Sequence, residues 1–289
     1  MSLFKKQVSL HGLRSYLSRN DQTVSPAGFV AGGEKGSVGR KGGNVVLPGS
    51  PGVVAVWDDF LGHIADTGAV PGWELLNGDA DTGVSGGTTY VSAANGVIRL
   101  NWATSAQPGV AGPVAVSTNA IKNWKANQGN LRFAARVKIP SLTAVQAYIG
   151  FSDSGGADFP AYDTGTNAAA GFLSNMTEGI GFMYTQGGGV TTWRGVATKG
   201  DADQSMTASV STVPSPTANV YDVLEIQLSQ DSGQNADFFI NGAHVGRIAN
   251  PLDAAVALAP GFWLSGTDTG TIQLDVDWVN ISAARDSGT

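Results

Sequence analysis

The 289-residue sequence contains no cysteine, which excludes a disulfide framework and any metal site built on thiolates. Charged residues make up only 14% of the chain, and no stretch approaches the ~20 consecutive apolar residues of a membrane span. The stretch after Lys5 and Lys6 has no continuous apolar segment like that of a secretion signal. We therefore expect a protein made in a cytoplasm, with no membrane span and no sequence-encoded export.

Common catalytic motifs are also missing. Gly-x-Ser-x-Gly does not occur, and nothing in the sequence places a nucleophilic serine beside His11, His63 or His244. These three histidines do not have the spacing of metal ligands. The glycine run 187–189 lacks the Lys-Ser/Thr of a phosphate-binding loop, so nucleotide binding is not supported. The sequence predicts no catalytic residues and a protein that is not an enzyme.

The segment 220–248 shows most clearly what the chain does contain. Leu224, Ile226 and Leu228 alternate with polar residues, which is typical of a strand buried on one face. After a polar break, a second apolar run enters Asn241-Gly242, a pair that favours a tight hairpin turn because both central residues need a positive φ. The segment therefore predicts three antiparallel strands in succession and no helix.

Similar short strands are expected along residues 53–289. Residues 130–139 alternate cleanly, whereas 145–151 and 179–184 are apolar on both faces, as in strands covered on both sides. The last predicted strand spans 271–281, with Ile272, Leu274, Val276 and Trp278 on one side. About a dozen strands at short intervals predict an all-β sandwich or barrel.

Residues 1–52 differ from the rest in composition and charge. Their 7 basic residues outnumber 2 acidic ones, giving +5, while the remaining 10 basic and 21 acidic residues give −11. The density of Gly and Pro from 21 to 52 prevents this segment from forming a core of its own. We expect an extended basic arm that docks on an acidic surface; the alternative is a solvated leader with incidental charge. The cations of the predicted arm are Lys5, Lys6, Arg14, Arg19, Lys35, Arg40 and Lys41.

Three motifs carry a resemblance to a known fold family. These are Asp-Asp-Phe followed by Trp-Glu near residue 73, Phe-Ile-Asn-Gly at 239–242, and Leu-Asp-Val-Asp-Trp-Val-Asn-Ile at 274–281. Over roughly residues 55–283 the chain resembles the concanavalin A-like lectin/glucanase jelly roll, which implies a sandwich of two antiparallel sheets. The Gly-rich leader and the Ala/Gly/Thr-rich body also resemble tailed-bacteriophage virion proteins in composition.

A glucanase of this fold would need a Glu-x-Asp-x-Glu triplet, which is absent. Asp222 and Glu225 should lie on opposite faces of a strand because their separation is odd. Asp275 and Asp277 should share a face, but no glutamate accompanies them, so a surface or turn-anchoring role is expected. The carboxylates therefore argue against a glucanase.

Two further kinds of site were considered. Trp102, Trp124 and Trp193 have polar or basic neighbours and are the candidates for a glycan-facing aromatic platform, although core or interface packing is the expected role of each; Trp57, Trp73, Trp263 and Trp278 are predicted to be core. Residues 77–83 resemble the start of a calcium loop, so Asp79 and Asp81 are the first candidates for calcium, although turn capping explains them without a metal.

These observations favour a virion structural protein, a capsid decoration (cement) protein located on the capsid surface. The arm, 1–52, would anchor the sandwich, 53–289, to the major capsid protein and to other copies of the chain, as a homo-oligomer with a trimer as the family analogy suggests. No cofactor, nucleic acid or membrane partner is expected. The alternative is a carbohydrate-binding, lectin-like module of a phage tail or head fibre, and a third option is a hydrolase whose carboxylates the sequence does not reveal.

Overall fold

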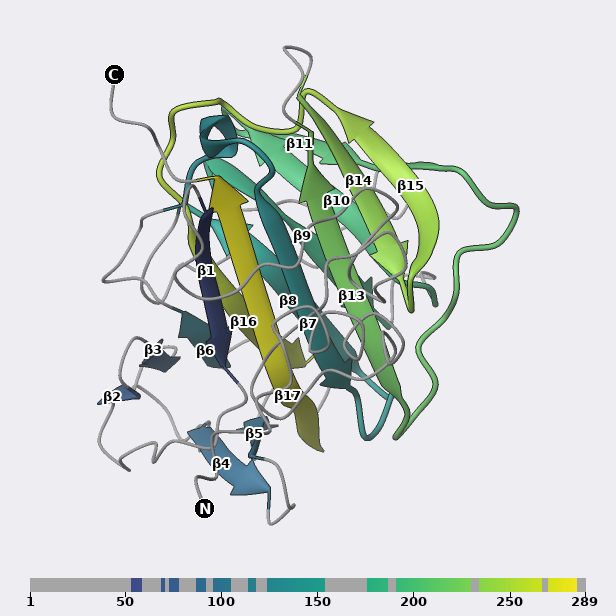
Figure 1. Cartoon of the computed structure of the whole chain (residues 1–289). Helices are drawn as coiled ribbons and strands as arrows, with labels where there is room; N and C mark the ends of the chain where they lie inside the picture. Colours follow the sequence, from purple (N-terminus) through teal and green to yellow (C-terminus); the bar gives the residue numbers. More distant parts are fainter. Residues whose placement is uncertain are drawn as a thin grey trace, which may run out of the picture.

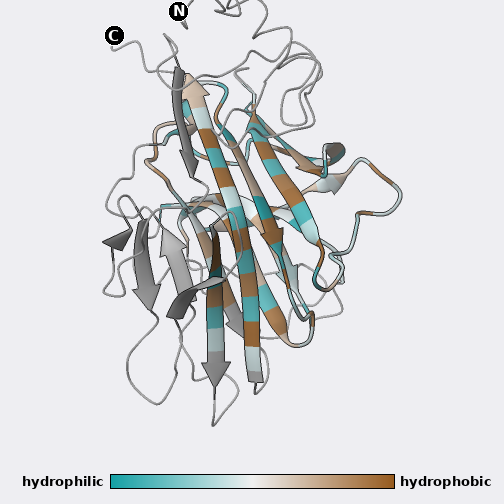
Figure 2. Ribbon diagram, turned by 60° about the horizontal axis from the view of Figure 1, so that its bottom comes forward, coloured by the Kyte–Doolittle hydropathy of each residue, from teal (hydrophilic) through white to brown (hydrophobic). Residues whose placement is uncertain are grey.

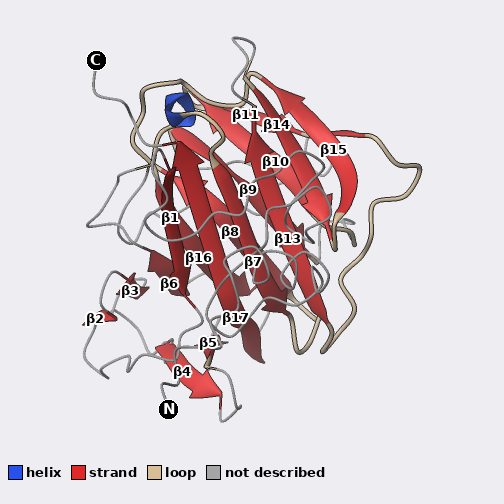
Figure 3. Cartoon of the chain, in the orientation of Figure 1, coloured by secondary structure: helices blue, strands red, loops and turns tan. Residues whose placement is uncertain are grey.

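The computed structural model describes residues 53–58, 69–70, 73–77, 87–91, 96–104, 114–117, 124–153, 176–186, 191–229, 234–266 and 270–284. The predicted arm and its seven cations, Asp79, Asp81, His11 and His63 lie outside these ranges. Within the described ranges no α-helix occurs, and no helix is long and apolar enough to cross a membrane. The prediction of an all-β chain is confirmed (Figure 3).

Two antiparallel sheets face each other (Figure 1). The nine-stranded sheet, sheet A, has the order β12-β15-β14-β13-β7-β17-β5-β4, with β1 also paired to β17. Its strands are β1 (Val53–Asp58), β4 (Gly87–Val91), β5 (Val97–Thr104), β7 (Arg132–Lys138), β12 (Thr207–Ala208), β13 (Tyr221–Leu228), β14 (Asn235–Ile240), β15 (Ala243–Ala249) and β17 (Gly270–Ala284).

The eight-stranded sheet, sheet B, has the order β11-β10-β9-β8-β16-β6-β3-β2. Its strands are β2 (Ala69–Val70), β3 (Trp73–Asn77), β6 (Val114–Ser117), β8 (Val145–Ser152), β9 (Glu178–Thr185), β10 (Arg194–Lys199), β11 (Ala202–Ser205) and β16 (Ala259–Gly266). A 3-10 turn, η2 (Ala126–Gln128), leads into β7. The predicted sandwich of two antiparallel sheets is thus confirmed.

The segment 220–248 folds as the sequence predicted. β13, β14 and β15 are consecutive antiparallel neighbours, and β14 and β15 are joined through Asn241 and Gly242. Both turn residues have positive φ, 50° and 80°, as a type I′ turn requires. The edge strand beside β15 is short, because β12 contains only Thr207 and Ala208.

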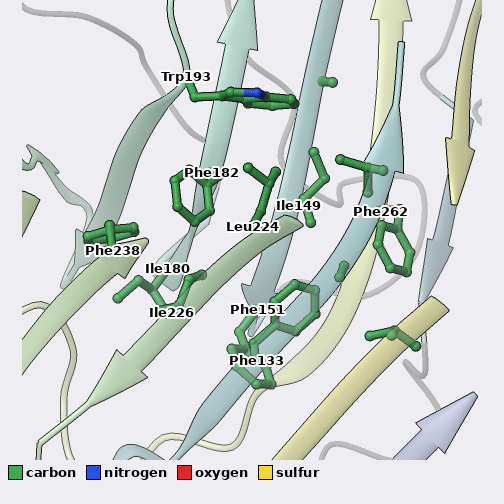
Figure 4. Packing of buried hydrophobic residues seen from close by; sticks show 14 of the residues in the cluster. Phe133, Ile149, Phe151, Ile180, Phe182, Trp193, Leu224, Ile226, Phe238 and Phe262 are labelled. Carbon is green, nitrogen blue, oxygen red and sulfur yellow. The ribbon is translucent and has the colours of Figure 1, made fainter. Parts of the chain in front are cut away.

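The core fills the space between the sheets, where the inward side chains of both meet (Figure 4). Aromatic rings pack edge to face within it, with ring centroids 5.3 Å apart for Phe182 and Phe238 and 5.5 Å for Phe133 and Phe151. Apolar and polar bands alternate along the described strands of sheet A (Figure 2). In contrast, β8 is buried along its whole length and β9 at all but its last residue, as their apolar sequences predicted.

A bulge in β17 changes which face the end of that strand presents. The register with β7 shifts between Val276 and Trp278, so Val276 pairs with Val137 and Trp278 pairs with Arg136. Ile272, Leu274 and Val276 therefore point into the core, whereas Trp278 lies on the outer face. The prediction that all four share one side was wrong at Trp278.

Candidate functional site

The outer face of sheet A, opposite the core, collects most of the ion pairs of the described residues. Residues paired across neighbouring antiparallel strands lie on the same face. The registers therefore place polar side chains from β5, β7, β13, β14, β15 and β17 together on this face. They include one group around Asp275, one around Asp237, and the pair of Glu225 with Arg132.

The first group is centred on Asp275, whose side chain is fully buried. Arg99 donates from Nε and Nη2 to its two carboxylate oxygens at 2.5 Å and 2.8 Å, and Lys138 Nζ lies 3.0 Å from Oδ2. Arg136 forms an ion pair with Asp277. Tyr221 lies beneath the two neighbouring cations, with Arg136 Cζ 4.1 Å and Lys138 Nζ 4.9 Å from its ring centroid.

Asp275 and Asp277 share a face, as predicted, and each forms ion pairs there. Asp275 pairs with Arg99 and Lys138, and Asp277 pairs with Arg136. The hydrogen bond to Asp275 raises the pKa of Arg99.

Asp222 and Glu225 lie on opposite faces of β13, as their spacing predicted. Glu225 is on the outer face and accepts hydrogen bonds from Arg132, at 3.0 Å and 2.7 Å, and from Gln227. Asp222 is on the core side and accepts hydrogen bonds from Trp193 Nε1 and Asn241 Nδ2, both at 2.9 Å. Both carboxylates therefore have structural partners.

The second group lies at the β12–β15 edge of sheet A. His244 Nε2 is 2.8 Å from Asp237 Oδ1, and His244 Nδ1 is 2.8 Å from Ser209 Oγ. Arg247 donates to both oxygens of Asp237 at 2.8 Å each. The sequence reasoning found no serine beside a histidine and missed this array, because Ser209 and His244 are 35 positions apart and meet only through the pairing of β12 with β15.

A third polar feature, which we call the acidic rim, surrounds the start of β9. It consists of Asp153, Glu178, Asp201, Asp203 and Asp253, with Lys199 among them. Glu178 accepts backbone N–H groups of Gly200 and Asp253, both at 2.9 Å. Burial raises the pKa of Glu178, and the negative charges of Asp253 and Asp153 raise it further, against the opposing effect of the two backbone donors. The rim is therefore a region of negative potential.

Sheet B also carries a buried cluster on the face that points away from the core. Tyr148, Met176, Met183, Val196 and Trp263 pack together there. A Cβ at Gly181 would lie 2.5 Å from the ring of Tyr148, so a glycine is required opposite that ring. The hydroxyl of Tyr148 donates to the carbonyl of Phe151 at 2.7 Å, and burial raises its pKa well above 10.0. These side chains are packed against protein and present no open aromatic surface.

The described tryptophan side chains are all buried, which confirms the packing role expected for them and leaves no exposed ring for a glycan; the side chains of Trp57 and Trp73 lie outside the described part of the chain. The three glycan-facing candidates, Trp102, Trp124 and Trp193, are 1%, 6% and 1% exposed and all belong to the core between the sheets. Trp263 and Trp278, predicted to be core, are buried on the outer faces of sheets B and A. At Trp102, which lies in β5, the polar neighbours suggested a glycan-facing role, although in a strand they occupy the opposite face and say nothing about the side chain between them.

Metal binding has no candidate within the part of the chain that the structure describes, where no group of three or more His, Asp or Glu side chains could hold an ion. The calcium candidates Asp79 and Asp81 lie outside the described residues. Calcium binding at that loop stays a prediction.

Comparison with known proteins found no matching family model and no matching curated protein. Solved structures do match. A protein of unknown function from Shewanella oneidensis MR-1 is 13% identical, with 82% of this chain and 89% of that chain covered and a TM-score of 0.53. The laminarinase from Rhodothermus marinus is 15% identical, with 80% and 97% covered and a TM-score of 0.49. The Bacillus licheniformis β-glucanase is 12% identical, with 80% and 98% covered and a TM-score of 0.46.

These likenesses correct one prediction. The expectation that the protein is not an enzyme is contradicted, because glycoside hydrolases are among the solved structures that this chain resembles. Two of the structures named above are glucan hydrolases and the third has no known function, so the virion assignment draws no support from them. At 10–15% identity the likeness shows the fold alone. The chain has the jelly-roll sandwich fold of the concanavalin A-like glucanases.

Proposed function

We propose that the protein is an assembly protein, a capsid decoration protein on the surface of a virion, in which the basic arm of residues 1–52 binds an acidic protein surface. The observation that carries this proposal is the division of charge. The arm holds +5 and the remainder −11, and the acidic rim offers a concentration of carboxylates on the described part of the sandwich. Opposite charges on two parts of one chain favour association between copies.

The composition of the rim supports this role. Asp201 and Asp253 are exposed, and Lys199 Nζ lies 3.3 Å from Asp253, so one lysine is set among five carboxylates. Burial is the main cause of the raised pKa of Glu178, and added cations would lower the repulsion from Asp253 and Asp153 that contributes to it. The partners in this proposal are the major capsid protein and other copies of the chain, arranged as a homo-oligomer with a trimer as the first arrangement to test.

The alternative function is a carbohydrate-binding module, for which three tryptophans were the candidate aromatic platform. Trp102, Trp124 and Trp193 are core residues, and glycan recognition by stacking needs exposed rings. No other observation on the described residues favours glycan binding over assembly.

The test compares the full-length protein with a variant in which all seven arm cations are replaced by glutamine. A second variant, with each Lys changed to Arg and each Arg to Lys, keeps the charge and serves as the matched control. Binding to particles stripped of the protein is measured by co-sedimentation, and self-association by sedimentation velocity. We expect the glutamine variant to lose about tenfold or more in affinity and the control to bind normally.

The second half of the test varies the ionic strength and the carboxylates of the acidic rim. Binding should weaken as ionic strength rises, because exposed charge pairs are screened over about 10 Å at 0.1 M salt. Asp201→Asn combined with Asp253→Asn should weaken self-association, since it removes two exposed carboxylates of the rim. The glutamine variant binding as tightly as the wild type would refute the proposal.

A further inference from the structure

The array of Ser209, His244 and Asp237 has the connectivity of a nucleophile, a base and an orienting carboxylate. Ser209 Oγ is 2.8 Å from His244 Nδ1, and His244 Nε2 is 2.8 Å from Asp237 Oδ1. A carboxylate can only accept, so Nε2 carries the proton in neutral imidazole and Nδ1 is the free base facing the serine hydroxyl. The two nitrogens have exchanged the positions they hold in serine proteases, but either one can accept a proton.

The surroundings hold the imidazole in place. The ring of Phe239 lies against His244, with centroids 5.0 Å apart. Arg247 binds both oxygens of Asp237, so the carboxylate cannot turn away from the histidine. The backbone N–H of Ser209 donates to the carbonyl of Val245 at 2.9 Å, which fixes the serine beside the strand that carries His244. All three side chains are therefore positioned by the fold of the β12–β15 edge.

The site is open to a ligand. Ser209 is exposed, and the side chains of His244 and Asp237 are 34% and 19% exposed. Val210, directly after the serine, is one of the exposed large apolar residues of the described chain and offers a contact for a short acyl group. Its backbone N–H follows the nucleophile in sequence, as one oxyanion donor does in the α/β-hydrolases. An exposed site with one small apolar contact suits a small acyl substrate rather than a polymer.

We propose that Ser209, His244 and Asp237 form a serine nucleophile site that hydrolyses small activated carboxylic esters. Ser209 Oγ forms a bond to the ester carbonyl carbon as His244 Nδ1 takes its proton. The bond from that carbon to the leaving oxygen then breaks, and the proton on Nδ1 passes to the leaving alcohol or phenol. Water attacks the acyl-serine in the same way, which releases the carboxylic acid and restores the serine hydroxyl. Asp237 stabilises the imidazolium at each step.

The experiment uses the full-length protein with two probes, diisopropyl fluorophosphate and 4-nitrophenyl acetate. Intact mass and peptide mapping show whether one phosphoryl adduct forms and where, and the release of 4-nitrophenol reports turnover. The variants are Ser209→Ala, His244→Gln and, as the matched control, Ser211→Ala, because Ser211 is an exposed serine in the same segment. Thermal unfolding of each variant checks that the fold is kept.

We expect a single adduct on Ser209 in the wild type and in Ser211→Ala, and none on Ser209→Ala. His244→Gln should lower both the labelling rate and turnover about 100-fold, the usual contribution of a general base. If the array only fastened the sheet edge, Ser209 would be no more reactive than Ser211. An absent adduct, an adduct elsewhere, or an unchanged rate in His244→Gln would overturn the proposal.

Discussion

Trp193 donates its indole N–H to Asp222 Oδ2 at 2.9 Å, and this hydrogen bond joins the two sheets across the core. Trp193 directly precedes β10 of sheet B, and Asp222 lies in β13 of sheet A. Asn241, from the β14–β15 turn, donates to the other carboxylate oxygen at 2.9 Å. The carboxylate thus ties a strand, a turn and the opposite sheet together, with Trp193 only 1% exposed.

Replacing Asp222 with Asn should destabilise the protein. The amide has one acceptor oxygen for two donors, so either Trp193 or Asn241 would face an N–H group. We expect the free energy of unfolding to fall by about 1–3 kcal/mol, the cost of an unsatisfied buried donor. Chemical denaturation measures this, with Asp201→Asn as the control because Asp201 is exposed and its positive φ of 63° suits asparagine. Equal effects of the two substitutions would contradict the prediction.

Asp275 and Asp277 should differ in their contributions to stability. Asp275 is fully buried between Arg99 and Lys138, whereas Asp277 has a 12% exposed side chain and a partner, Arg136, that is 40% exposed. Removing one partner of a buried ion pair costs about 3–5 kcal/mol, and an exposed pair contributes about 1 kcal/mol or less. We expect Asp275→Ala to lower the free energy of unfolding by more than Asp277→Ala does. In chemical denaturation, the midpoint of Asp275→Ala should therefore lie below that of Asp277→Ala.

Gly150 should not tolerate a side chain. A Cβ there would lie 2.2 Å from the carbonyl oxygen of Ile180 and 2.5 Å from Gly181 Cα, and both are backbone atoms that cannot move aside. Gly150→Ala should therefore cost about 3 kcal/mol or more. Gly200→Ala is the comparison, because a Cβ there meets nothing within 4 Å and only the φ of +54° opposes it, at about 1 kcal/mol. In thermal unfolding, the melting temperature of Gly150→Ala should lie well below that of Gly200→Ala.

The pairing of Asp237 should appear as a dependence of stability on pH. Burial would raise the pKa of Asp237, but hydrogen bonds from Arg247 and His244 outweigh it and hold the pKa below 3.8. A carboxyl with a lowered pKa stabilises the fold above its unfolded-state value, and this stabilisation disappears as the pH falls through its folded-state value. The difference in unfolding free energy between the wild type and Asp237→Asn should thus shrink below about pH 3.8. A difference that stays constant from pH 5 to 2 would contradict this.

Local sequence patterns determined the secondary structure and the class of fold. The φ angles of Asn241 and Gly242 depend on those two residues, and the alternation of Leu224, Ile226 and Leu228 specifies the buried face of β13 without reference to the rest of the chain. The spacing of Asp222 and Glu225 likewise placed them on opposite faces. Such features are local, because a turn or a strand face involves residues close in sequence.

The sites were decided only by the tertiary structure. A bulge in β17 turned Trp278 to the outer face, and strands covered on both sides gave no pattern that could separate Trp193 in the core from Trp263 on the outer side of sheet B. Ser209 and His244 are brought together by the pairing of the two-residue strand β12 with β15. No local sequence pattern predicts this pairing. Contacts between distant segments depend on sheet order and register, and these follow from the packing of the whole sandwich.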